Sequence, residues 1–212
     1  MTNISFKKYL TINAIGFGLG GLLWGLVLYL ELPDLEFPFH FMAILIMGLF
    51  GGISLVWFDK SIRNISKSVV AGFLGWVVGF VAGIILSYPL YLYGSLLLSS
   101  LGYLIEVETL KRIINLVPDI GVGSLWLVFL LIGAIVGFFY ALFLKTKIWP
   151  LVWRGGLGLG LASLIGPVIG NLIGNLCNSL LVSYLVTFGL IGMIFGKFLA
   201  WGVYKNYGGK DI

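Results

Sequence analysis

Six charge-poor stretches, each about 20 residues long, make up most of this chain. A helix rises about 1.5 Å per residue, so each stretch is long enough to cross about 30 Å of hydrocarbon. Helices are favoured there because backbone polar groups in lipid must pair within the protein. The sequence therefore predicts an all-α, polytopic membrane helix bundle. Its six transmembrane helices are expected at about 10–30, 41–58, 69–88, 124–144, 156–176 and 181–204.

Composition agrees with this class. The chain is 60% hydrophobic and 10% charged, whereas soluble domains carry about 25% charged residues. The connecting segments are too short to hold a separate soluble domain. We therefore expect residues 1–212 to form a single integral membrane domain, a multi-pass protein of the cell membrane surrounded by the lipid bilayer.

The basic residues gather on one side of the six stretches. Under the positive-inside rule that side is cytoplasmic, so both termini are expected inside. The net charge of +5 is then a signal of topology, and nucleic-acid binding, which needs a basic face outside the bilayer, is not expected. The residues that set this orientation are Lys7, Lys8, Lys60, Arg63, Lys67, Lys145, Lys147, Arg154, Lys205 and Lys210.

One pattern occurs three times along the chain: a basic residue, a helix with small residues at every fourth position, a turn, and a helix with a GxxxG pair. It predicts three two-helix hairpin repeats at about 8–60, 67–145 and 154–205. Chance is the alternative, because the chain has 31 glycines. Residues four apart share a helix face, where glycine allows close helix packing. The glycines expected to do so are Gly16, Gly20, Gly48, Gly52, Gly75, Gly79, Gly83, Gly133, Gly137, Gly166, Gly170, Gly192 and Gly196.

The middle hairpin carries an insertion at about 89–122. The stretch 69–105 has no charge and is too long for one span. Two spans meeting at Pro89 would place the basic segment 145–154 outside, against the positive-inside rule. We therefore expect the third helix to leave the membrane near Pro89 and the segment at about 100–117 to form an outer interfacial amphipathic helix. It would either form a functional face or cover exposed helix ends.

Catalytic groups are sparse. His40 is the only histidine and Cys177 the only cysteine, and every Asp and Glu falls in a predicted loop or tail. A zinc site or an intramembrane acid pair would need more ligands or acids at membrane depth. We expect no catalytic residue, metal or cofactor, and no enzyme activity.

Polar residues within the predicted spans are the remaining candidates for a site. Three asparagines recur at one helix face, where their amides need hydrogen-bonding partners. A proline in the same helix lacks one backbone donor. A lysine lies inside the last span and could either snorkel to the headgroups or face a wet cleft. The candidate substrate-binding residues are Asn13, Pro167, Asn171, Asn175, Asn178 and Lys197.

Two functions fit these observations. The first is small-solute transport or solute binding through a cleft between the hairpins, which the asparagines would line. The alternative is a non-catalytic subunit or assembly factor of a membrane complex, docked on a membrane protein partner or forming a homo-oligomer. Where the asparagines lie discriminates between the two, since a cleft favours the first and tight helix contacts favour the second.

Overall fold

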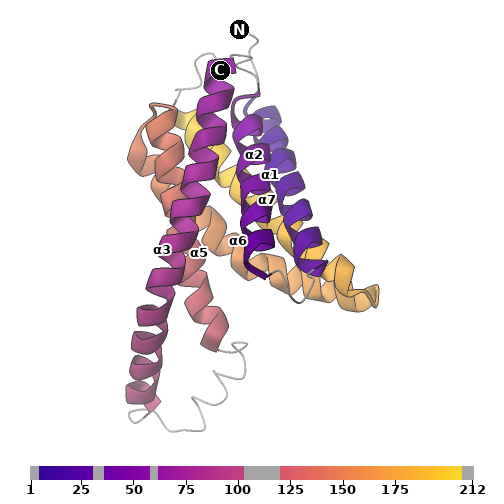
Figure 1. Ribbon diagram of the computed structural model, residues 1–212, viewed down its shortest axis with the longest axis vertical. Helices are drawn as coiled ribbons and strands as arrows, with labels where there is room; N and C mark the ends of the chain where they lie inside the picture. Colours follow the sequence, from indigo (N-terminus) through magenta and orange to yellow (C-terminus); the bar gives the residue numbers. More distant parts are fainter. Residues whose placement is uncertain (1–4, 31–35, 58–61, 103–119, 207–212) are drawn as a thin grey trace.

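The computed structural model describes residues 5–30, 36–57, 62–102 and 120–206 (Figure 1). Over 36–44, 90–102 and 120–125 the description is limited almost entirely to the helical backbone. The described chain is entirely helical, as predicted. Its helices are α1 (Phe6–Tyr29), α2 (Glu36–Leu55), α3 (Ile62–Gly102), α5 (Ile120–Phe143), α6 (Ile148–Leu176) and α7 (Leu180–Asn206).

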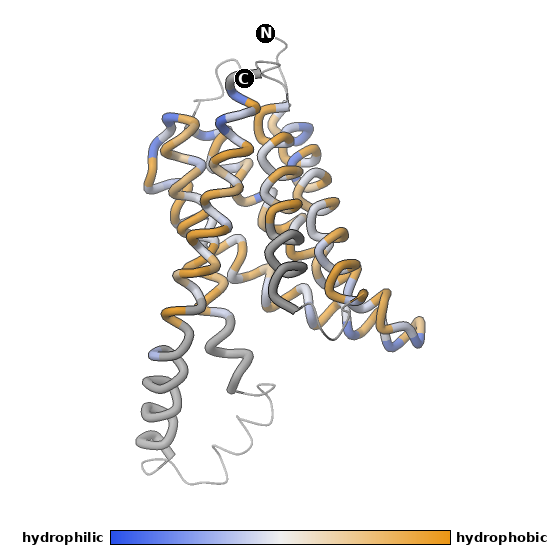
Figure 2. The backbone as a smooth tube through the Cα atoms, viewed as in Figure 1, coloured by the Kyte–Doolittle hydropathy of each residue, from blue (hydrophilic) through white to orange (hydrophobic). Residues whose placement is uncertain are grey.

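Five of these helices are long and apolar enough to cross a membrane, which supports a multi-pass membrane protein. They are α1, α3, α5, α6 and α7. The part of α2 with described side chains, Leu45–Leu55, is also apolar but shorter. Figure 2 shows hydrophobic positions along the helices and hydrophilic ones mainly near their ends.

α3 does not end near Pro89, where the third helix was expected to leave the membrane. It continues through Pro89 to Gly102 as a single helix of 41 residues. A proline lacks only one donor of the helical ladder, so the hydrogen bonds on either side can hold the helix together. The insertion at about 89–122 thus begins as a helical extension, which projects beyond the other helices in Figure 1. The expected amphipathic helix lies almost entirely outside the described residues.

The main helix contacts form a closed ring. Each helix packs against its neighbours in the chain, and α7 returns to pack against α1. α1 begins and α7 ends at the same end of the bundle (Figure 1). The order around the ring is therefore α1, α2, α3, α5, α6, α7. The helices pair as three successive hairpins: α1 with α2, α3 with α5, and α6 with α7.

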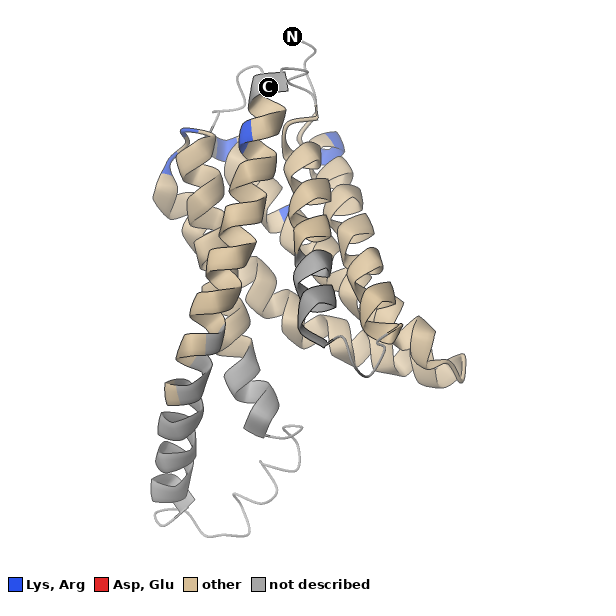
Figure 3. Ribbon diagram, viewed as in Figure 1, with Lys and Arg blue, Asp and Glu red and all other residues tan. Residues whose placement is uncertain are grey.

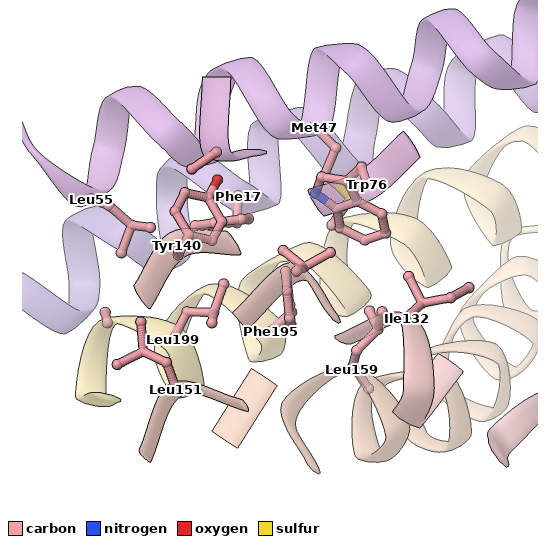
Figure 4. Packing of buried hydrophobic residues seen from close by; sticks show 14 of the residues in the cluster. Phe17, Met47, Leu55, Trp76, Ile132, Tyr140, Leu151, Leu159, Phe195 and Leu199 are labelled. Atoms are coloured by element: carbon pink, nitrogen blue, oxygen red, sulfur yellow. The ribbon is translucent and has the colours of Figure 1, made fainter. Parts of the chain in front are cut away.

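Aromatic side chains fill the middle of this ring. Phe17 packs edge-on against Phe195 at a centroid distance of 5.4 Å, and Phe195 contacts Trp76 at 5.5 Å. Trp76 continues to Trp24 at 6.2 Å, while Tyr140 lies 6.4 Å from Phe17. Figure 4 shows the rings of Phe17, Trp76, Tyr140 and Phe195 among the surrounding aliphatic side chains. The described centre is thus a packed aromatic core.

Glycines lie where helices approach most closely. A Cβ built on Gly20 would lie 2.8 Å from the Cα of Met47, and one on Gly52 would lie 2.8 Å from the carbonyl oxygen of Ser68. Real Cβ atoms do not tolerate such distances. Each glycine of the pattern that occurs three times in the sequence faces one particular neighbouring helix in the ring. Gly16, Gly20, Gly75, Gly79, Gly83, Gly166 and Gly170 face the second helix of their own hairpin, and Gly48, Gly52, Gly133, Gly137, Gly192 and Gly196 face the next hairpin.

Basic side chains mark one end of the bundle (Figure 3). The start of α1 and the α5–α6 turn, with Lys145 and Lys147, lie there. No Asp or Glu occurs among the residues whose side chains the structure describes. We refer to this as the basic end, and its cytoplasmic location stays a prediction.

Cysteine labelling tests the orientation. In a Cys177→Ala background, a cysteine at Asn64 should react with an impermeant maleimide only from the cytoplasm, because it adjoins the basic residues Arg63 and Lys67. A cysteine at Asp119, on the predicted outer loop, should react only from outside. Reaction of position 119 from the cytoplasmic side would contradict both the orientation and the number of spans.

A pair of glycine substitutions tests the packing. A Cβ on Gly137 would overlap the Leu151 carbonyl of α6, whereas one on Gly79 would lie 3.2 Å from the Ile132 Cγ2 methyl and 3.3 Å from the Ile132 carbonyl oxygen. The contacts at Gly79 need a shift of only a few tenths of an ångström, but the overlap at Gly137 requires the two helices to separate. Gly137→Ala should therefore destabilise the protein by about 1–3 kcal/mol, and Gly79→Ala by less. Unfolding in detergent measures both. Equal effects would show that backbone proximity at Gly137 does not limit side-chain size.

Candidate functional site

Asn13 belongs to a buried hydrogen-bond network between α1 and α2 near the basic end. Its Nδ2 donates to the Tyr9 carbonyl at 2.9 Å, and its Oδ1 lies 3.2 Å from the Ser54 hydroxyl. The Tyr9 hydroxyl donates at 2.8 Å to the carbonyl of Leu55, the last residue of α2. Terminal carbonyls of a helix lack intrahelical donors, so this tyrosine satisfies one of them. Asn13 is completely buried and ties the first hairpin together.

The asparagines of α6 lie on the outside of the bundle. Asn171 and Asn175 are both exposed. The Asn171 Oδ1 accepts a hydrogen bond of 2.9 Å from the Ser183 hydroxyl of α7, which links the two helices of the last hairpin. Neither asparagine faces the aromatic core.

Asn178 terminates α6. Its backbone has a φ of +48°, in the left-handed region that asparagine tolerates better than most residues. The Ser179 amide donates to the Gly174 carbonyl at 2.9 Å, and the Asn178 amide to the Asn175 carbonyl at 3.2 Å. This pair of bonds is a Schellman motif, which satisfies carbonyls at the helix end. Lys145, with a φ of +54°, holds the matching position after α5.

Pro167 and Lys197 also lie apart from one another. α6 continues through Pro167, whose side chain is half-buried. Lys197 of α7 is exposed. The Oδ1 of Asn13 accepts a hydrogen bond from the Ser54 hydroxyl and not from Lys197.

The structure therefore distributes the six candidate residues over three places: the buried α1–α2 contact, the outer part of α6, and the exposed surface of α7. It brings together Asn171 and Ser183, and Asn13 with Tyr9 and Ser54. The centre that a cleft would need is occupied by rings. The role of the six candidate residues in substrate binding stays a prediction.

Sequence reasoning placed Arg154 only as an anchor at the membrane surface, but the structure buries it. It is 8% exposed, and its Nε and Nη1 have no hydrogen-bond partner among the described residues. Its Cζ lies 4.7 Å from the ring centroid of Trp201 and 5.6 Å from that of Trp153. Cation–π attraction thus holds a charge that has no carboxylate partner among the described side chains. In the sequence, only the adjacent Trp153 indicates that Arg154 could be held by aromatic rings.

A second feature that the sequence did not reveal is a groove on the outer surface between α1 and α7. It has a volume of about 340 Å³ and an entirely apolar lining. Gly18 and Gly189 contribute to it, because neither fills the space with a side chain. The walls come from Ile15, Leu19 and Leu22 of α1 and from Leu190 and Met193 of α7.

Comparison with known proteins found no matching family model, no matching curated protein and no matching solved structure.

Substitutions at Asn178 separate a structural role from a binding role. Asn178→Gly should keep or slightly raise stability, because glycine adopts positive φ freely. Asn178→Val should lower it by about 1–2 kcal/mol, the cost of a left-handed conformation for a residue with a Cβ. Thermal unfolding in detergent measures the difference. Equal stability of the two variants would contradict the helix-terminating role.

Proposed function

We propose that this chain is a non-catalytic subunit or assembly factor of a membrane complex, built as three repeated hairpins that form a closed ring and docked through the outer face of α6. The observation that carries the proposal is a pair of exposed carboxamides, Asn171 and Asn175, on a helix face that is otherwise apolar.

The triplication is supported by burial at aligned positions. Aligning the second helices on their GxxxG pairs superimposes Met47, Ile132 and Ile191, and each of these is 3% exposed or less. Seven residues after the first glycine of each pair stand Leu55, Tyr140 and Leu199, all essentially buried. Aligned glycines also face equivalent neighbours around the ring. Chance pairs of glycines have no reason to share both properties.

The outer face of α6 fits a partner helix. Val168, Leu172 and Leu176 recur every fourth residue and are 67%, 62% and 79% exposed. Asn171 lies on the same face, about 25 Å along the helix from Arg154 and thus within a hydrocarbon layer of about 30 Å. Lipid offers its Nδ2 donors no acceptor, whereas a transmembrane helix with polar side chains does.

Solute transport has less support. The middle of the ring is filled by side chains, and the candidate asparagines do not border the groove between α1 and α7. Transport would require a path that opens between hairpins held together by backbone-level contacts at glycines. A docking role requires no such rearrangement.

Photo-crosslinking tests the docking face. A photoreactive residue at Leu172 should give a protein adduct in native membranes, and one at Val81, a 50% exposed position on α3, should not. Replacing Asn171 and Asn175 by leucine should remove most of the adduct at position 172. The leucines match the amides roughly in size but cannot hydrogen-bond. The adduct's mass distinguishes a different subunit from a second copy of this chain.

A thermal-shift screen of small solutes provides the opposing measurement. Transport predicts a solute that stabilises the wild type and not the double leucine variant, while docking predicts none. An adduct at position 81 as strong as that at 172, or one unaffected by the leucines, would contradict docking through α6. Loss of stability without loss of adduct would make the amides purely structural, at about 1 kcal/mol each.

A further inference from the structure

The groove between α1 and α7 has a glycine on each of its two helices, Gly18 and Gly189. A Cβ on Gly18 would lie 2.6 Å from the Met193 Cγ, and one on Gly189 3.0 Å from the Leu22 Cδ2. Both glycines are therefore covered only by flexible side chains at the surface. The first helices of the hairpins can be aligned on Gly16, Gly75 and Ala162, and the second helices on their GxxxG pairs. In this alignment, the other two contacts between hairpins carry larger residues at the positions of Gly18 and Gly189. They are Val77 and Leu45 between α3 and α2, and Leu164 and Leu130 between α6 and α5.

Cationic side chains continue the line of the groove toward the basic end. Residues four apart are neighbours on a helix face, so Lys197 follows Met193, which lines the groove, and precedes Trp201 and Lys205. The Lys205 Nζ lies 5.4 Å from the Trp201 ring centroid, and the Arg154 Cζ lies 4.7 Å from it. Two cations thus contact the Trp201 ring, and Lys197 lies one helical turn before it, next to the groove.

Among the side chains that the structure describes, no acid accompanies these cations. Aromatic rings hold the Arg154 guanidinium. Lys197 and Lys205 are both exposed. Anionic lipid headgroups are the abundant counter-ions at this level of a bilayer, and basic pockets between transmembrane helices bind them.

We propose that α1 and α7, together with Arg154 of α6, form a binding site for an anionic phospholipid, with the phosphate held by Lys197, Lys205 and Arg154 and one acyl chain in the groove. The groove spans Leu185 to Met193 on α7, about 12 Å along the helix, and runs away from the cations as an acyl chain runs away from its headgroup. A partner helix would have to place its own apolar face beside Lys197, at a desolvation cost that a phosphate avoids. This site is on a different surface from the docking face of α6.

Lipid titration tests the site. Binding of dioleoyl phosphatidylglycerol and dioleoyl phosphatidylcholine to the full chain in dodecyl maltoside is measured by native mass spectrometry and thermal shift. The wild type should prefer the anionic lipid. Lys197→Gln should weaken its binding about fivefold, the effect of one cation near a membrane surface, while Lys197→Arg should retain it. Lys145→Gln, at an exposed lysine of the basic end that lies off the groove, should bind as the wild type does.

Filling the groove tests the acyl chain separately. Gly189→Leu keeps every cation, and its nearest neighbour is the movable end of Leu22. It should unfold near the wild-type temperature and lose the preference for phosphatidylglycerol. Inorganic phosphate alone should give no shift. The proposal is overturned if both lipids bind equally, if Gly189→Leu binds phosphatidylglycerol as well as the wild type, or if a protein crosslinks at Leu19 and excludes lipid. None of these outcomes bears on the α6 adduct.

Discussion

Close approach of helix backbones is the constraint on which the rest of the structure depends. Inside a bilayer, apolar side chains gain little from leaving lipid for protein, so helices associate through van der Waals contact and hydrogen bonds. At Gly52 and Gly137, a Cβ would collide with the backbone of the next helix. Six such interfaces close the ring, and that closure brings α7 back to α1. The groove depends on this last contact, and the cation cluster depends on the contact between α6 and α7.

The helices and their polarity were predictable because a bilayer fixes length and composition. Glycine spacing follows the helical period and so indicates which helix faces pack, while the repetition of the three hairpins stays a prediction. The continuation of α3 through Pro89 was not predictable, because a proline lacks one donor but the surrounding ladder decides whether the helix ends. A charge count over 69–105 cannot distinguish a long helix from a span followed by a surface segment.

The candidate site was harder to predict than the fold. Asn13 and Asn171 are both intramembrane asparagines, yet one is completely buried in a network with Tyr9 and the other is exposed beside α7. Nothing in their local sequence separates them, because the direction a side chain faces is set by which helices close the ring. Arg154 shows the same limit. Its basic position suggested an anchor, and only the approach of α7 supplies Trp201.

The centre of the described ring is packed, and the two surfaces proposed above as binding sites lie at its periphery. Gly18 and Gly189 stand where the other contacts between hairpins carry branched residues, and they leave the groove open. Polar or charged side chains interrupt the outer surface at Asn171 and Lys197. If the repeats arose to build a stable ring, differences between them are where function can be added without weakening the core. The outer face of α6 and the groove between α1 and α7 are two such differences, and they leave the aromatic centre unchanged.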